Sequence, residues 1–154
     1  MAFRKYLTEF IGTFFLMFTI GMVVVPPGAP EGLAPVAIGC VLVALVYAGG
    51  HVSGAHYNPA VTVAMLIRRR IPRAEVPGYL IAQFAAAALA AGAVLVLKGD
   101  WELYSLSAPV LRPGGVILAE FLFTFALIWV ILEVALAPET AGNPFYGVAI
   151  GLVV

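Results

Sequence analysis

The chain has 154 residues, of which 63% are hydrophobic and 10% are charged, and its formal net charge is zero. Soluble domains carry about 25% charged residues, so this composition excludes a soluble globular domain and indicates an integral membrane protein. The neutral charge gives no basic surface for nucleic acid. The single cysteine, Cys40, cannot form an intrachain disulfide, and no cysteine or histidine spacing typical of a zinc site is present.

Four long apolar segments follow one another along the sequence, at residues 6–25, 33–50, 76–97 and 116–135. Each is long enough to cross a hydrocarbon core of about 30 Å, so we expect four membrane-spanning helices. A fifth apolar segment begins near Pro144 and has run for eleven residues at Val154, where the sequence stops. The pattern predicts an all-α integral membrane protein.

Between the second and third apolar segments lies the polar stretch HVSGAHYNPAVTVA, residues 51–64. Asn58 can cap a helix, Pro59 suits the first helical position, and residues 60–67 can continue the helix. Gly54 and its neighbours indicate non-helical backbone, which is tolerated at membrane depth only inside protein or beside a water-filled cavity. A soluble loop before an N-capped helix is the alternative, but the flanking apolar segments argue against it. The stretch therefore predicts a short helix that begins within the membrane beside a pore.

An internal repeat relates the two ends of the sequence. Residues 7–18 (LTEFIGTFFLMF) match residues 118–129 (LAEFLFTFALIW) at half of their positions, and VAIG at 36–39 recurs at 148–151. Because an odd number of spans separates the copies, the second copy should be inverted in the membrane, which places a pathway near the midplane. We expect one transmembrane domain over residues 1–154. It would hold a first repeat at about 1–97 and a partial second repeat at about 114–154.

The basic residues predict the orientation. Six of the eight lie in the first five residues or in the link at 68–73, whereas only Lys98 and Arg112 lie in the other links. Because positively charged links stay in the cytoplasm, we expect a multi-pass protein of the cell membrane with a cytoplasmic N-terminus. The short helix and the segment before it would then enter the membrane from the cytoplasmic side.

The run SGAHYNPAVTVA resembles the first signature of the major intrinsic proteins, the aquaporin and glycerol-facilitator family. The resemblance covers the whole chain as about two-thirds of a family member. It implies an aquaporin-like bundle with an inverted repeat and a re-entrant half-helix. It also implies about five spans of six. The internal repeat, at an offset of 112 from Asn58, predicts a second half-helix near position 170, past the end of the sequence. The implied activity is a passive channel for water and for small uncharged solutes such as glycerol, in a homotetramer embedded in the lipid bilayer, without a cofactor.

The resemblance also implies roles for individual residues. The pore would be formed at the triplet Asn58, Pro59 and Ala60, and by the backbone carbonyls of Gly54, Ala55, His56 and Tyr57. Glu9 and Glu120 would hold the re-entrant loops by accepting hydrogen bonds from backbone N–H groups, and Gln83 would bond to the first loop. The alternatives are an interfacial position for Glu9 and ordinary interhelical bonds for Glu120 and Gln83.

Two further positions need an interpretation. His51 and His56 make a poor metal site, because no cysteine or matching carboxylate lies near them, and we interpret both as loop histidines with satisfied hydrogen bonds. We count His51 among the residues that support the loop. Ile38, twenty residues before Asn58, is the position that the resemblance implies for the second-helix member of a narrow selectivity ring. Simple packing within the bundle is the alternative for Ile38.

Other function classes have less support from the sequence. No nucleophile, base and orienting group occur together at a recognisable spacing, so we do not expect an enzyme. A secondary transporter would need a coupling site, and the stretch at 51–64 has no acidic residue to supply one. A fragment that inserts into the membrane without conducting remains the alternative to a channel.

Overall fold

The computed structural model describes residues 2–30, 32–99 and 113–154, and in these ranges all regular structure is helical. Within these ranges four helices are long and apolar enough to cross a membrane, the last two together with the short helical elements that adjoin them. The elements are α1 (Ala2–Val24), α2 (Leu33–Ser53), α3 (Pro59–Ile67), η1 (Arg73–Glu75), α4 (Val76–Lys98), α6 (Pro113–Ile131), η2 (Leu132–Leu136), η3 (Pro138–Thr140) and α7 (Tyr146–Leu152).

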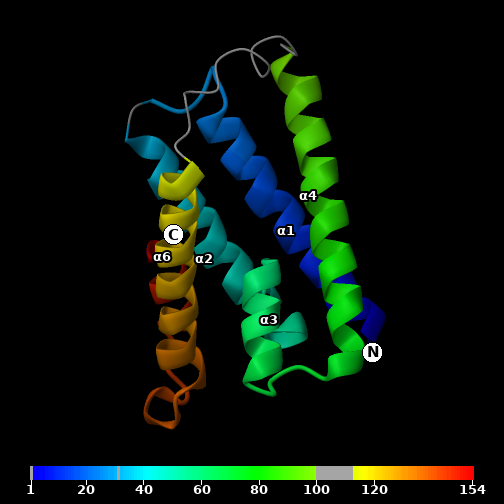
Figure 1. Cartoon of the computed structure of the whole chain (residues 1–154), viewed down its shortest axis with the longest axis vertical. Helices are drawn as coiled ribbons and strands as arrows, with labels where there is room; N and C mark the ends of the chain where they lie inside the picture. The colour runs from blue at the N-terminus through cyan, green and yellow to red at the C-terminus, as the bar shows by residue number, and fades with distance from the viewer. Residues whose placement is uncertain (1, 31, 100–112) are drawn as a thin grey trace.

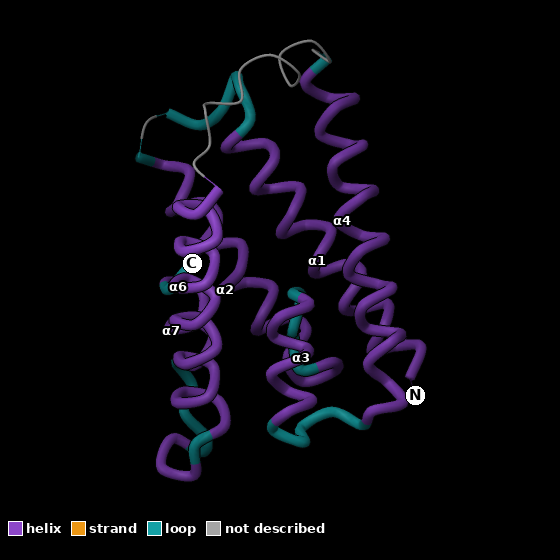
Figure 2. Tube along the Cα trace, viewed as in Figure 1, coloured by secondary structure: helices purple, strands orange, loops and turns teal. Residues whose placement is uncertain are grey.

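Helix α3 begins in the middle of the bundle and runs toward the end at which α1 begins (Figure 1). It has nine residues. At 1.5 Å per residue these span about 14 Å, less than half of a bilayer core. The non-helical backbone before α3 lies inside the bundle, and the link after it returns to the beginning of α4 (Figure 2). The predicted re-entrant half-helix is therefore present.

Small residues bring α1 and α4 together. Ala82, Ala86 and Ala90 form a buried stripe along α4, and Ala86 and Ala90 are fully buried. At the far end of this stripe, Val94 lies against Gly21 of α1 so closely that a Cβ atom on Gly21 would approach Val94 Cγ2 to 2.6 Å. Small residues permit such close approach in membranes, where packing rather than the hydrophobic effect drives helix association.

Lys98 joins the other ends of these two helices. Its ammonium group donates to the carbonyl oxygens of Met22 at 2.8 Å and Val25 at 2.7 Å, and also to that of Pro27. The last carbonyls of a helix lack partners within the helix and carry a partial negative charge. Lys98 thus caps α1 from α4. Arg112, the other basic residue expected on this side, lies outside the described residues.

The two copies of the repeat meet at corresponding residues. Helices α1 and α6, which carry the longer match, run in opposite directions (Figure 1). In the shorter match, Gly39 of α2 packs against Gly151 of α7: a Cβ atom on Gly39 would lie 2.8 Å from the carbonyl oxygen of Gly151, and one on Gly151 would lie 2.7 Å from that of Gly39. Such reciprocal contact is expected where a pseudo-twofold axis passes between inverted copies.

The structure corrects one boundary that matters for the site. The sequence places the end of the second span at Gly50, but α2 continues to Ser53. It ends there because Gly54 adopts a left-handed conformation with φ 89°, and its N–H group still bonds to the carbonyl of Gly50. A polar side chain such as that of His51 does not by itself break a helix, whereas a left-handed glycine commonly ends one.

Candidate functional site

The candidate site is the segment 54–58, which joins α2 to α3. Gly54, Ala55 and Tyr57 have positive φ values of 89°, 50° and 49°, and Asn58 is extended. Positive φ is uncommon outside glycine and costs about 1–3 kcal/mol for each residue, so the surrounding structure must hold this backbone in place. Two of the residues under strain, Ala55 and Tyr57, are buried.

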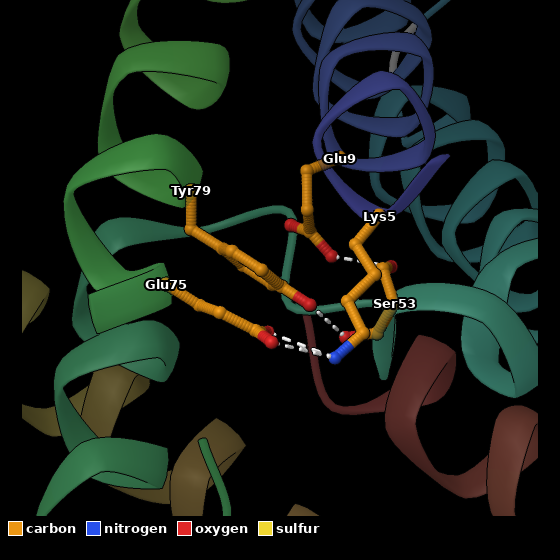
Figure 3. Close-up of polar contacts among 5 residues, drawn as sticks. All are labelled: Lys5, Glu9, Ser53, Glu75 and Tyr79. Atoms are coloured by element: carbon orange, nitrogen blue, oxygen red, sulfur yellow. Dashed lines mark hydrogen bonds and ion pairs between the residues drawn. The ribbon is translucent and has the colours of Figure 1, made fainter. Parts of the chain in front are cut away.

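Glu9 of α1 supplies most of that support. Its fully buried carboxylate accepts four hydrogen bonds. Oε1 accepts from Ser53 Oγ at 2.6 Å and from the N–H of His56 at 3.0 Å, while Oε2 accepts from the N–H of Tyr57 at 2.7 Å and from Gln83 Nε2 at 2.9 Å. A buried carboxylate is tolerated when several donors replace its water. Figure 3 shows Glu9 of α1 bonded to Ser53 at the end of α2.

Gln83 and Thr62 connect this network to the half-helix. Gln83 Nε2 also donates to Thr62 Oγ1 at 2.9 Å, and Thr62 Oγ1 donates to the carbonyl of Asn58 at 3.2 Å. His56 Nδ1 lies 3.1 Å from the same Thr62 hydroxyl. Gln83 and Thr62 are almost completely buried. Helices α1, α4 and α3 are therefore joined through side chains at the middle of the bundle.

The backbone of the segment shows an asymmetry between donors and acceptors. The N–H groups of Ala55, His56 and Tyr57 are all bonded, the first to Ser53 Oγ at 3.1 Å and the others to Glu9. The carbonyl oxygens of residues 54–57 accept no hydrogen bond from the described residues. Since a carbonyl oxygen can accept from water, the segment offers a row of four acceptors.

Asn58 has the conformation and the contact of a helix cap. Its Oδ1 accepts from the N–H of Ala60 at 2.7 Å, and Pro59 occupies the first turn of α3. Its side-chain NH₂ has no partner among the described residues and is free to donate. The N-terminus of a helix carries a partial positive charge of about half an elementary charge. A free donor and a positive helix end therefore follow the row of acceptors.

A cavity of about 770 Å³ opens beside the segment, at the end of the bundle where α1 begins. The segment contributes Gly54, Ala55 and His56 to its wall. Other walls come from α1, α4 and α7, with Lys5, Tyr79 and Ile150 as examples. Three of the four residues that carry the acceptors thus line a space large enough for several water molecules.

Three residues expected at the site do not join the hydrogen-bond network around the segment in the described residues. His51 is exposed in the last turn of α2, where it lines the cavity, and its side chain forms no hydrogen bond within the described residues. The interpretation of His51 as a loop histidine with satisfied hydrogen bonds is corrected, because α2 continues past it. Glu120 is exposed on α6 beside a second cavity of about 400 Å³, and its side chain forms no hydrogen bond within the described ranges. Ile38 is half-buried on α2 and lies outside the wall of the large cavity.

Three residues of the network were missed by the sequence analysis. Ser53 bonds to Glu9, Thr62 bonds to Gln83, and the Tyr79 hydroxyl donates to the carbonyl of Ser53 at 2.6 Å. Ser53 and Thr62 stand inside the run that carries the resemblance, but polarity alone did not indicate their partners. Tyr79 precedes Gln83 by one helical turn and shares its face of α4, which was a usable signal.

The fold and the site together define a class: a membrane bundle with an inverted repeat, in which a half-helix begins at mid-depth behind a backbone segment held by buried polar side chains. The family model described as "Major intrinsic protein" matches residues 1–154. The chain belongs to the major intrinsic protein family. Members of this family are channels and not enzymes, which confirms the expectation of a non-enzyme.

Curated relatives agree with this assignment. The chain is 39% identical over 156 residues to Aquaporin NIP1-4 of Oryza sativa subsp. japonica and 36% identical over 160 residues to Nodulin-26 of Glycine max. Both matches cover 96% of this chain and 56% of the relative. It is 40% identical to Glycerol uptake facilitator protein-like 6 of Lactiplantibacillus plantarum, over 97% of this chain and 71% of the relative. The chain spans about half the length of the two plant relatives.

Proposed function

We propose that this chain contributes to a passive transmembrane channel for water and small uncharged solutes, with the segment 54–58 lining the path. The observation that carries the proposal is the asymmetry of this segment. Its N–H groups at 55–57 are bonded to Glu9 and Ser53, while its carbonyl oxygens at 54–57 accept no hydrogen bond from the described residues. A row of acceptors at membrane depth suits a file of water molecules, which donate to it as they pass.

In this mechanism Asn58 is the donor at the centre of the membrane. Its NH₂ group would give a hydrogen bond to the oxygen of a passing water or solute hydroxyl, while its Oδ1 stays bonded to the N–H of Ala60. The positive N-terminus of α3 would raise the energy of a cation or proton at this point. A neutral molecule exchanges its hydrogen bonds along the row, whereas an ion would lose its hydration without compensation.

Water is the primary substrate in this proposal, and glycerol is the second candidate. The printed names of the relatives support both, since one is an aquaporin and another a glycerol uptake facilitator. Ile38 remains the proposed member of a selectivity ring, and Glu120 the proposed support of a second re-entrant loop. We propose His51 only as part of the cavity wall. A fragment that inserts without conducting is the alternative.

We further propose a single domain of two repeats, residues 1–97 and 114–154, in a homotetramer of the cell membrane with its N-terminus in the cytoplasm. The tetramer rests on the family alone. The orientation rests on charge: the beginning of α1, whose sequence includes Arg4 and Lys5, lies at the same end of the bundle as the arginine-rich link at 68–73 (Figure 1). Positive charge is retained on the cytoplasmic side.

Cysteine labelling tests the orientation. In a Cys40→Ser background, a membrane-impermeant maleimide added to intact cells is expected to label Pro30→Cys and to leave Arg68→Cys unlabelled. Both positions are exposed, and the link after α1 and the link after α3, which contain them, lie at opposite ends of the bundle. After the cells are permeabilised, both variants should react, which controls for accessibility. Labelling of Arg68→Cys alone in intact cells would show the reverse orientation.

Asn58→Asp tests the pore. A carboxylate at this position removes the free donor and partly cancels the positive helix end, so osmotic water flux into liposomes is expected to fall by about tenfold, equivalent to one hydrogen bond of about 1.4 kcal/mol. Cation conductance should rise in the same preparation. Asn143→Asp is the control for a carboxylate in the cavity wall away from the helix end, because Asn143 lines the cavity from the link before α7 and its Oδ1 bond to the N–H of Phe145 survives the change.

The outcomes separate the proposals. Full water flux and unchanged conductance in Asn58→Asp would remove Asn58 from the path. If liposomes with the unaltered chain swell no faster than liposomes without protein, the non-conducting alternative is correct.

A further inference from the structure

Ser53 is the last residue of α2 and directly precedes the segment 54–58. Its hydroxyl and its carbonyl oxygen both form hydrogen bonds. Its hydroxyl donates to Glu9 at 2.6 Å and accepts from the N–H of Ala55 at 3.1 Å. Its carbonyl oxygen accepts from the Tyr79 hydroxyl at 2.6 Å. The next four carbonyl oxygens, at 54–57, accept nothing from the described residues. The row of free acceptors therefore begins immediately after the carbonyl that Tyr79 occupies.

Neighbouring side chains hold Tyr79 where its hydroxyl can donate to the Ser53 carbonyl oxygen. Its side chain is 1% exposed, and its ring packs edge-on against Tyr6 with centroids 5.9 Å apart and lies 5.0 Å from the ring of His56. One turn earlier, the end of η1 is tied to α1 by an ion pair in which Lys5 Nζ lies 2.8 Å from Glu75 Oε2. Figure 3 shows this pair beside the Tyr79 hydroxyl. The contacts of the Tyr79 ring with Tyr6 and His56, together with the ion pair that ties η1 to α1, thus fix the position and angle of the Tyr79 hydroxyl.

The two contacts on α1 come from one face of that helix. Lys5 and Glu9 are four residues apart, so they lie one above the other along α1. Lys5 fixes the start of α4 through Glu75, and Glu9 fixes the segment through Ser53. The Tyr79 hydroxyl adds a third contact, which links the start of α4 directly to the same Ser53.

We propose that Tyr79 is a positioning residue of the path: by occupying the Ser53 carbonyl it sets where the row of free acceptors begins and holds Gly54 in its left-handed conformation. The inference rests on the proposed function for the meaning of the acceptor row. Through Tyr79, α4 determines which carbonyl oxygen begins the row of acceptors beside the cavity. Glu9 of α1 binds N–H groups of the same segment. Without the hydroxyl, the Ser53 carbonyl becomes available to water at the cavity wall.

The test compares Tyr79→Phe with Tyr6→Phe in the full chain in lipid bilayers. Both changes remove one hydroxyl from neighbouring rings, but the Tyr6 hydroxyl has no hydrogen bond within the described residues. Ser53 and Gly54 form the only Ser-Gly pair in the sequence, so ¹³C-carbonyl serine with ¹⁵N-glycine selects the Ser53 carbonyl in a magnetic resonance spectrum. This resonance reports the hydrogen bond itself, which a purely packing role for the ring would not move.

We expect the Ser53 carbonyl resonance to move upfield in Tyr79→Phe and to stay unchanged in Tyr6→Phe. Amide exchange at Ala55 and His56 should accelerate by about five- to tenfold in Tyr79→Phe, the effect of losing one hydrogen bond. An unchanged resonance in Tyr79→Phe, or equal shifts in both variants, would overturn the proposal. If Tyr79→Phe fails to fold, uniform 3-fluorotyrosine labelling replaces it: this stronger donor should move the resonance downfield, and no movement would overturn the proposal.

The same measurements distinguish this inference from the proposed function. If the unaltered chain passes no water but the resonance moves in Tyr79→Phe, the channel proposal fails and the contact of Tyr79 with Ser53 stands. If the chain passes water and the resonance does not move, only the role of Tyr79 fails.

Discussion

Replacing Glu9 with alanine is expected to lower the free energy of unfolding by about 3–5 kcal/mol, because the change leaves buried donors without a partner. The donors are the Ser53 hydroxyl, the N–H groups of His56 and Tyr57, and one N–H of Gln83. Glu9 is fully buried, so its position has no surface open to bulk water. The measurement is reversible unfolding in mixed micelles, together with hydrogen exchange of the two amides, which should lose their protection.

Glu120→Ala is the matched control for Glu9→Ala. The repeat places Glu120 at the position equivalent to Glu9, but its side chain is exposed on α6 and accepts no bond from a loop in the described residues. We expect its removal to change the stability of this chain by less than about 0.5 kcal/mol. Equal losses in the two variants would show that Glu9 stabilises the bundle through its charge or its helix and not through the segment.

Gly49→Ala is expected to destabilise the bundle by about 1–3 kcal/mol through overpacking. The ring of Tyr57 enters a space between two glycines, and an added Cβ atom on Gly12 or on Gly49 would overlap it. On Gly49 the same atom would also approach Thr8 Cγ2 to 2.8 Å. Tyr57 cannot move aside without loss, because its hydroxyl donates to the carbonyl of Leu45 at 3.0 Å and its N–H to Glu9. The added methyl group should therefore displace Tyr57 and distort the backbone of the segment 54–58.

The adjacent residue provides the control for this change. A Cβ atom on Gly50 would meet nothing nearer than the Tyr146 hydroxyl at 3.5 Å, an ordinary contact. Gly50→Ala should therefore retain the gain in helix propensity, about 1 kcal/mol, and stabilise α2. Opposite signs for the two neighbouring substitutions, measured by unfolding in mixed micelles, are the expected result. Stabilisation by both would show that Tyr57 does not fill the space as described.

The half-helix could be predicted because its signals are local. Asn58 caps α3 through its side chain and Pro59 begins it, as the sequence indicates. The strong apolar runs likewise predict the four long helices. The end of α2 was predicted less accurately, because the polar residues from His51 to Ser53 were interpreted as a loop. The backbone preference of Gly54 decides the boundary, and side-chain polarity does not.

The network around the segment was harder to predict, because its contacts are long-range. Glu9 bonds to Ser53 and Gln83 across 44 and 74 residues of sequence. The resemblance implies that Glu9 and Gln83 support the loop, but no periodicity pairs a given donor with a given oxygen. Tyr79 shows the limit most clearly. Its place on the face of Gln83 could be derived from helical spacing, whereas its bond to a backbone carbonyl depends on how α4 packs.

The contact between Gly39 and Gly151 bears on how the two repeats could have diverged. In a dimer of identical single-repeat chains, these two positions would be one residue facing its own symmetry mate, and any enlargement would be introduced twice in the same space. In one continuous chain the two can be altered separately, and their surroundings already differ. A Cβ atom on Gly39 would meet only the Gly151 backbone, whereas one on Gly151 would also overlap Val43. Because the two copies are not identical, a larger side chain at Gly151 would meet more atoms than one at Gly39.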